Sequence, residues 1–210
     1  MLASNIRGWG RYCLIPATPN VFSLTHRFPY SLYRWATPVF CTEKQTAVHQ
    51  LKVAGIKVSD IQYVILSHFH ADQIGGVCDF PQASFVYMQE AYDNVKQRSG
   101  LSAIRAGFLP DLLPRDFERR SLPVDEKQLI GVDVPGHAAG QMGVLFVTED
   151  QPYFLCADAV WSSRAYREAL PPHWLTGLIL DSRHEYKDSF QRIHQFHREH
   201  PGLETVSFDR

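Results

Sequence analysis

The chain has 210 residues, of which 45% are hydrophobic and 20% charged, and its formal net charge at pH 7 is −1. This composition is that of an ordinary globular protein, and the length suits one domain with a sizeable core better than two. Lys and Arg are scattered along the chain, so no nucleic-acid partner is predicted. No apolar run reaches the length of a signal peptide or the roughly 18 residues of a membrane span, which predicts a cytoplasmic protein without membrane association.

The cysteine pattern supports the same compartment. Four cysteines are spread over the chain without a CxxC pair, namely Cys13, Cys41, Cys78 and Cys156. In a chain of this size such spacing predicts reduced thiols in a cytosolic protein and not a disulfide framework.

The predicted elements alternate between short strands and helices, which indicates an α/β fold. In chain order they are β-like pieces at 12–15 and 21–24, a helix at 45–54, a buried strand at 61–67, a strand at 84–88, a helix at 89–96, a loop-and-helix excursion at 98–122, strands at 129–134, 143–147 and 153–156, an amphipathic helix at 184–199 and a last strand at 204–208. Polar residues gather where several of these strands end. Open α/β folds place their ligands and catalytic groups at such strand ends.

A pair of histidines follows the buried strand at 61–67, in the stretch SHFHADQIGG. In extended backbone, His68 and His70 point the same way because they are two residues apart, and this arrangement suits two imidazoles on one ion. Asp72 follows at the same spacing. A lone histidine at a strand end is more often structural, but two with an aspartate at this spacing predict a metal site.

Two further candidate ligands come from later strand ends. His137 lies in PGHAAGQ, after the strand at 129–134, where small neighbours let the backbone approach a site. Asp158 follows the strand at 153–156, and a buried carboxylate there needs a cation or several hydrogen bonds. The alternative is that Asp158 is the N-cap of a helix.

These stretches resemble the metallo-β-lactamase superfamily, and within it the N-acyl-homoserine-lactonase-like hydrolases. The resemblance rests on SDIQYVILSHFHADQIGG, FPQASFVYMQEAY, VPGHAAGQMGVLF and YFLCADAVW, which span about residues 59–161. It implies a four-layer αββα sandwich, with residues 1–210 forming a single domain of this kind and metal bound between the sheet edges. The family's HxHxDH motif matches His68, His70 and Asp72, its downstream histidine matches His137, and its bridging aspartate matches Asp158.

The chain departs from the family's pattern at three places. Gln73 stands where the family has a histidine that binds a second metal, and the last strand is followed by VSFD without the family's final histidine. The stretch PVFCTEKQ lacks the family's Asp-Thr-Gly turn. Because a neutral amide is a poor zinc ligand beside imidazole, we expect one zinc ion rather than two, with iron as the other possible metal.

The predicted function is a metal-dependent hydrolase of a lactone or ester. A metal-bound hydroxide would attack the carbonyl, with Asp72 as the general base. If Asp158 also closes the coordination sphere, no open position remains and catalysis suffers. Two alternatives stay open, namely a non-catalytic relative with a degraded metal site and a mononuclear-iron oxygenase that acts on a thiol or persulfide.

The expected substrate is a small molecule with an apolar portion. In the resemblance, the apolar residues of 98–122 and the side chains of Trp161, Tyr166 and Trp174 would flank a pocket for an acyl chain, although such residues also simply pack cores. Three histidines on the last helix, His194, His197 and His200, recur every three residues. We expect them to lie on a solvated or half-buried helix flank and not to bind metal.

Overall fold

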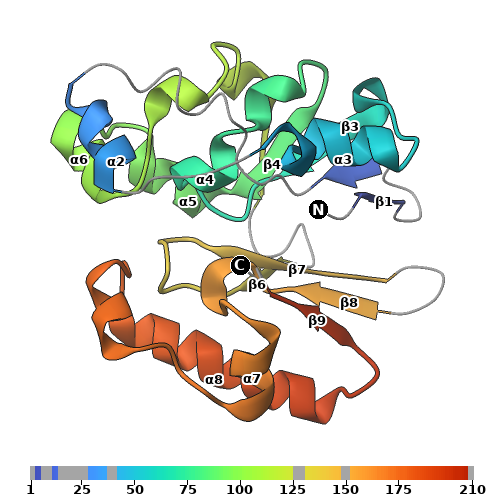
Figure 1. Cartoon of the computed structure of the whole chain (residues 1–210), viewed down its shortest axis with the longest axis vertical. Helices are drawn as coiled ribbons and strands as arrows, with labels where there is room; N and C mark the ends of the chain where they lie inside the picture. Colours follow the sequence, from blue (N-terminus) through green and yellow to red (C-terminus); the bar gives the residue numbers. More distant parts are fainter. Residues whose placement is uncertain are drawn as a thin grey trace. The chain divides into compact units, whose positions relative to one another are not determined.

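The structure is a computed structural model that describes residues 3–5, 11–13, 28–36, 42–124, 131–147 and 152–207. The chain divides into two compact units, which Figure 1 shows in ribbon form. The first unit contains Met1–Tyr87 and Tyr92–Pro123, and the second contains Met88–Ala91 and Val124–Arg210. The prediction that these residues form a single domain stays a prediction.

The first unit is built on a five-stranded sheet with strand order β1-β2-β3-β4-β5. Its strands are β1 (Ala3–Asn5), β2 (Arg11–Cys13), β3 (Ile61–Ile65), β4 (Ser84–Met88) and β5 (Ser121–Val124). The neighbouring pairs β2/β3 and β3/β4 are parallel, and β1/β2 is antiparallel. Ile61 and Val64 of β3 are almost fully buried, as expected for a parallel strand covered on both faces.

Short helices and single turns connect these strands. The helices are α2 (Tyr30–Ala36), α3 (Ala47–Val53), α4 (Ala71–Ile74), α5 (Gln89–Val95) and α6 (Gly100–Arg105). The 3-10 turns are η1 (Glu43–Gln45), η2 (Val58–Asp60), η3 (Val77–Asp79), η4 (Pro110–Leu112) and η5 (Glu118–Arg120). Helix α3 begins at Thr46, whose hydroxyl accepts a hydrogen bond from the His49 N–H, and its buried face carries Ala47 and Leu51.

A cluster of aromatic rings fills part of the first unit's core. Phe117 is 3% exposed and stacks on Phe85 and Tyr87, with ring centroids 5.0 Å and 5.5 Å away. Phe69 and Tyr92 lie 5.9 Å and 5.4 Å from the same ring. The cluster therefore ties β4, the turn before β5 and the segment that follows β3 into one packed body.

The second unit is built on a four-stranded sheet with strand order β6-β7-β8-β9. Strands β6 (Gly131–Asp133), β7 (Met142–Val147) and β8 (Pro152–Leu155) form an antiparallel meander, and β9 (Glu204–Val206) pairs with β8 in parallel. The helical segments are η6 (Ala157–Ala159), α7 (Ser163–Glu168), η7 (Trp174–Leu178) and α8 (Arg183–Glu199). Figure 1 shows α7 and α8 together on one side of this sheet.

Helix α8 packs through one amphipathic face. Its buried residues recur at helical spacing, namely Tyr186, Ser189, Phe190 and Ile193. Tyr166 of α7 is fully buried in the same core, and its hydroxyl donates a hydrogen bond to the Thr205 carbonyl at 2.7 Å. Tyr166 is thus a core residue, one of the two roles that its sequence context allowed.

The predicted elements agree with the observed ones to within a few residues where both are described. The strand predicted at 61–67 ends at Ile65, and the helix predicted at 184–199 is Arg183–Glu199. Strand β5 was not predicted, and its first two residues, Ser121 and Leu122, lie inside the segment expected to be a loop-and-helix excursion. The piece predicted at 21–24 lies outside the described residues. Of the described helices, none is long and apolar enough to cross a membrane.

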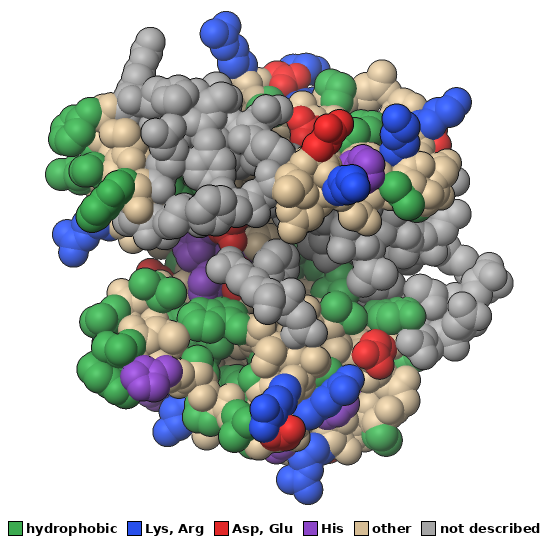
Figure 2. Space-filling model, viewed as in Figure 1, with side chains coloured by type: hydrophobic (Ala, Val, Ile, Leu, Met, Phe, Trp, Pro, Cys, Tyr) green, Lys and Arg blue, Asp and Glu red, His purple; other side chains and the backbone are tan. Residues whose placement is uncertain are grey.

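Some large hydrophobic side chains lie on the surface, where Figure 2 shows them in green. Trp174 is 71% exposed, so it does not pack the core, and it is not among the residues that line the cavity beside Trp161. In the excursion at 98–122, by contrast, most of the apolar residues are core. Ala103, Phe108, Leu109 and Leu112 are at most 2% exposed, whereas Leu101 is 60% exposed.

The aromatic cluster makes Phe117 a strong determinant of stability. We expect Phe117→Ala to lower the free energy of unfolding by about 3–5 kcal/mol, because it leaves a cavity among four rings. Urea unfolding of the variant measures this change. The control is Trp35→Ala, whose side chain is 86% exposed and whose loss is expected to change stability by less than about 0.5 kcal/mol. Equal effects in the two variants would contradict the packing described here.

Candidate metal centre

The first group of candidate ligands follows β3 in the first unit. Pairing with β4 continues for one residue beyond β3, since the Leu66 N–H donates to the Val86 carbonyl at 2.8 Å. The chain then runs through His68 and His70, whose ring centroids lie 4.6 Å apart with the planes at 84°. The two imidazoles therefore lie side by side, as their spacing predicts. His68 is fully buried, and its Nδ1 lies 3.1 Å from the hydroxyl of Ser67.

Phe69, between the two histidines, holds them in this orientation. Its side chain is 2% exposed and lies edge-on to Tyr87 at 5.1 Å, inside the aromatic cluster. Successive side chains of extended backbone point to opposite sides. Burial of Phe69 in the core therefore turns His68 and His70 together toward the other side.

Helix α4 begins directly after this pair. His70 is its N-cap residue, and its carbonyl accepts hydrogen bonds from the N–H groups of Gln73 and Ile74. Asp72 consequently lies in helical backbone, so the extended spacing that joins the two histidines does not continue to it. The role of Asp72 as ligand or general base stays a prediction.

The second group of candidate ligands lies in the second unit and pairs His137 with Asp158. Their side chains are 11% and 4% exposed, and His137 Nε2 lies 3.5 Å from Asp158 Oδ2. Asp158 lies within η6, whose N-cap is Cys156, and the N-cap of α7 is Ser162. The alternative interpretation of Asp158 as a helix cap is therefore wrong.

The backbone before Asp158 is in an unusual conformation. Ala157 has φ +48°, in the left-handed region where an L-residue with a Cβ is disfavoured by about 1–2 kcal/mol. Such conformations persist where the surroundings over-determine them, and they concentrate at functional sites. Here the left-handed residue makes the turn from β8 into η6, which carries Asp158.

The loop that carries His137 is tied to α8 and the segment before it. The loop is closed at its base by the Val134 N–H, which donates to the Gln141 carbonyl at 3.0 Å. Three consecutive carbonyls of the loop accept hydrogen bonds from outside it: Pro135 from the Ser189 hydroxyl at 2.8 Å, Gly136 from the Ser182 N–H at 3.0 Å and His137 from the Asp181 N–H at 3.3 Å.

Gly136 allows the loop to come this close to the helix. Its φ is +119°, and a Cβ built on it would lie 2.1 Å from the backbone nitrogen of Tyr186. Since backbone atoms cannot move aside as a flexible side chain can, only glycine fits here. Gly136, the first glycine of PGHAAGQ, thus serves the placement of the histidine that follows it.

Comparison with known proteins places the chain in a family. Residues 38–199 match the family model described as the metallo-beta-lactamase superfamily, which is most of the chain. The chain belongs to the metallo-β-lactamase superfamily. The family resemblance inferred from the histidine motif is confirmed by this match.

Curated relatives within the superfamily are distant. The probable metallo-hydrolase Rv2300c of Mycobacterium tuberculosis is 24% identical over 177 residues, which cover 75% of this chain and 57% of the relative. The N-acyl homoserine lactonase AttM of Agrobacterium fabrum is 23% identical over 186 residues, covering 79% of this chain and 64% of the relative. The chain thus spans less than two thirds of the length of these relatives.

Solved structures of other proteins agree with the fold. An N-acyl homoserine lactone hydrolase, with the product N-hexanoyl-L-homoserine at its catalytic metal centre, matches with a TM-score of 0.65 at 16% identity and covers 94% of this chain and 76% of its own. A probable metal-dependent hydrolase from Staphylococcus aureus matches with a TM-score of 0.63 at 11% identity, covering 99% and 88%. The predicted fold class, the α/β metallo-β-lactamase fold, is confirmed.

The departures from the superfamily's pattern lie partly within the described residues. Gln73 lies in α4 and is partly buried. Ser207, after β9, is described and partly buried, whereas 208–210 and 37–41 lie outside the described residues. The absence of a final histidine and of the Asp-Thr-Gly turn therefore remains a statement about the sequence.

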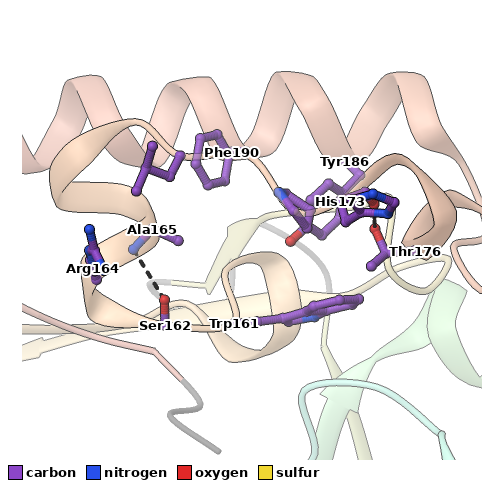
Figure 3. Close-up of a pocket in the computed structure, with 10 residues that line it drawn as sticks. Trp161, Ser162, Arg164, Ala165, His173, Thr176, Tyr186 and Phe190 are labelled. Atoms are coloured by element: carbon purple, nitrogen blue, oxygen red, sulfur yellow. Dashed lines mark hydrogen bonds between the residues drawn. The ribbon is translucent and has the colours of Figure 1, made fainter.

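A cavity in the second unit adjoins the His137 group. Its volume is about 430 Å³, and the residues that line it include Trp161, Ser162, His173, Thr176, Tyr186 and Phe190. In Figure 3 the Trp161 ring lies on one side of this space, and Phe190 and Tyr186 of α8 lie on the other. Trp161 also lies edge-on to His137, with ring centroids 6.1 Å apart. One indole is therefore a wall of the cavity and a neighbour of a candidate ligand.

Tyr186 is a protonated phenol in this wall. Burial raises the pKa of its hydroxyl well above the usual value of 10, and the negative charge of Asp158 raises it further. The side chain is 4% exposed and its ring lies 6.2 Å from that of Trp161. It is therefore neutral throughout the physiological pH range.

The histidines of α8 have structural surroundings, as expected. His194 Nδ1 lies 2.6 Å from the Tyr166 carbonyl, and His200 Nδ1 lies 3.0 Å from the Phe196 carbonyl. The ring of His197 packs edge-on against Tyr166 at 4.9 Å. These contacts stabilise the helix and its packing.

Sequence reasoning missed several residues that place the ligands. Ser67, Ala157 and Ser189 have no pattern that marks them, because a serine or alanine next to or far from a histidine is ordinary. Gly136 carried a signal, since it belongs to the small-residue stretch around His137. The role of Phe69 was implicit in the alternation along the chain, but its burial became evident only in the structure.

The hydrogen bond from Ser189 to the loop gives a test of this tether. Ser189 is fully buried, and we expect Ser189→Ala to lower the free energy of unfolding by about 1 kcal/mol, because the Pro135 carbonyl loses its donor. Urea unfolding measures the loss. Ser102→Ala, at an exposed position of α6, is the control and should change stability by less than about 0.5 kcal/mol. A neutral Ser189→Ala would show that the tether contributes nothing.

Proposed function

We propose that this chain is a metal-dependent hydrolase that opens a lactone or ester. In this proposal His68, His70 and His137 hold one metal ion, Asp158 shares it, and Asp72 handles the proton. The observation that carries the proposal is the donor chemistry of the two groups: paired imidazoles after β3, and an imidazole beside a buried carboxylate after β6 and β8. Membership of the metallo-β-lactamase superfamily adds support.

The side chains fit a zinc ion. Each of the three histidines offers one imidazole nitrogen, and imidazole with carboxylate oxygen is a common zinc ligand set. The 3.5 Å between His137 Nε2 and Asp158 Oδ2 is long for a hydrogen bond. Two ligand atoms on one tetrahedral zinc, each about 2.1 Å from it, lie about 3.4 Å apart, which favours a shared ion.

The chain's own residues divide the work of hydrolysis. A bound zinc ion would lower the pKa of water to about 7 and polarise a carbonyl. Ser67 contacts Nδ1 of His68, which favours Nε2 as the coordinating nitrogen of that ring. Asp72, two residues after His70, would take the proton from the attacking water as general base.

The cavity beside Trp161 would take an apolar portion of the substrate. Aromatic and aliphatic side chains line most of it, and Trp161 links it to His137. A substrate with its carbonyl near His137 would therefore extend its apolar part between Trp161 and α8. The relatives named N-acyl homoserine lactonases act on substrates that carry an acyl chain, in agreement with this assignment.

Elemental analysis of the purified protein tests the metal. We expect about one zinc ion per chain, lost in His68→Ala and in His137→Ala and kept in His194→Ala and His184→Ala; the His184 side chain is 86% exposed. Inductively coupled plasma mass spectrometry counts the ions. Metal loss in all four variants would show that the wrong histidines are assigned. One iron ion per chain would favour the oxygenase, and no metal would favour the non-catalytic relative.

Hydrolysis assays with a short and a long acyl ester or lactone test the cavity. We expect Trp161→Ala to raise KM for the long substrate about tenfold more than for the short one, because it removes apolar contact area from the cavity wall. Trp174→Ala is the matched control, since it removes an indole that is 71% exposed. An equal change for both substrates would contradict an apolar subsite at Trp161.

A further inference from the structure

We propose that Gly107 is a positioning residue for His70. The turn at Gly107 lies directly against the imidazole, and the missing side chain leaves the space that the ring occupies. The turn thereby holds the ring in the orientation from which it binds metal. The proposal rests on the proposed function to the extent that it takes His70 as a ligand.

The contact is closer than any residue with a Cβ allows. A Cβ built on Gly107 would lie 2.7 Å from Cδ2 of His70, 3.1 Å from Cγ and 3.2 Å from Nε2. Carbon atoms in favourable contact are about 3.5–4.0 Å apart. The Gly107 backbone therefore lies over the Cδ2–Nε2 edge of the ring, and a side chain at position 107 would have to displace the imidazole.

The turn is part of the end of α6 and has little freedom. Gly107 has φ +64°, and its N–H donates to the Ile104 carbonyl at 3.0 Å. The next N–H, of Phe108, donates to the Ala103 carbonyl at 2.9 Å. These bonds close the helix in the manner of a glycine-terminated helix end, so the position of the glycine follows from that of α6.

Both chain neighbours of His70 are attached to the same turn. The Ala71 N–H donates to the Gly107 carbonyl at 2.8 Å. On the other side, Phe69 lies edge-on to Phe108, with ring centroids 6.4 Å apart, and both rings are 2% exposed. The turn therefore holds the backbone on either side of His70 as well as its ring.

The size of the clash shows why the absence of a side chain at position 107 matters for His70 as a metal ligand. To restore an ordinary carbon contact, a methyl group at position 107 would have to push the His70 ring by about 0.8 Å, the difference between 2.7 Å and a normal separation. Zinc sites hold their ligand distances to within about 0.2 Å. A displacement of this size is enough to weaken coordination.

A second glycine separates the effect on His70 from the cost of the backbone conformation. Gly55 has φ +71°, close to that of Gly107, but a Cβ on Gly55 would meet no atom within 4 Å. Gly55→Ala therefore introduces a left-handed alanine without displacing a neighbour. It is a matched control for Gly107→Ala.

The experiment compares the zinc affinity of the two variants with that of the wild type, by competition with a chromophoric chelator, and records the absorption spectrum of the cobalt-substituted proteins. We expect Gly107→Ala to lose at least tenfold in zinc affinity and to show a shifted cobalt spectrum. Gly55→Ala should match the wild type in both. Equal zinc affinity in Gly107→Ala and Gly55→Ala would overturn the proposal.

Thermal unfolding of the metal-free proteins tests the contact independently of any metal. We expect adding His70→Ala to Gly107→Ala to recover the part of the Tm loss that exceeds the loss in Gly55→Ala, because the clash is with the His70 ring whereas the left-handed alanine remains. If His70→Ala restores nothing, the contact does not hold the ring and the proposal fails. A wild-type protein that binds no zinc would overturn the proposed function, and the contact between Gly107 and His70 would then have no role in metal binding. The Tm values of the metal-free proteins would still decide whether Gly107 holds the His70 ring.

Discussion

The burial of Phe69 is the constraint on which the first group of candidate ligands depends. An aromatic ring with 2% exposure, packed among other rings, leaves the residues before and after it no choice of direction. In extended backbone both side chains point to the face opposite Phe69, and both are histidines, of which His68 is itself fully buried. The hydrophobic effect, acting on one phenylalanine, thereby brings two polar imidazoles to within 4.6 Å of each other.

The second group depends on backbone contacts and not on a ring. His137 lies in a loop whose carbonyls accept hydrogen bonds from α8 and the residues before it, and Gly136 lets loop and helix meet. Asp158 directly follows Ala157, whose backbone is in the left-handed conformation. The left-handed backbone of Ala157 and the burial of the Asp158 carboxylate each cost free energy. Such costs are typical of sites retained for function.

The placement of candidate ligands was predictable because it follows from strand ends. His68, His70, His137 and Asp158 each follow an apolar run, and the structure confirms that each lies just beyond a strand. The expectation that Asp72 continues the extended spacing of the two histidines is wrong, because α4 begins at Ala71. The sequence did not reveal this helix start, since its N-cap residue, His70, is not one of the residue types that usually cap helices. Strand β5 was missed since a proline and polar neighbours concealed a short edge strand.

The sequence by itself determined the family, the α/β class and the residues able to bind a metal, because these depend on residue types at short spacings along the chain. Only the tertiary structure decided what holds those residues in place. Gly107 lies against the ring of His70, and Ser189 reaches the Pro135 carbonyl, although 37 and 54 residues separate the partners. No local pattern records contacts between distant segments, since they arise when whole helices pack against loops.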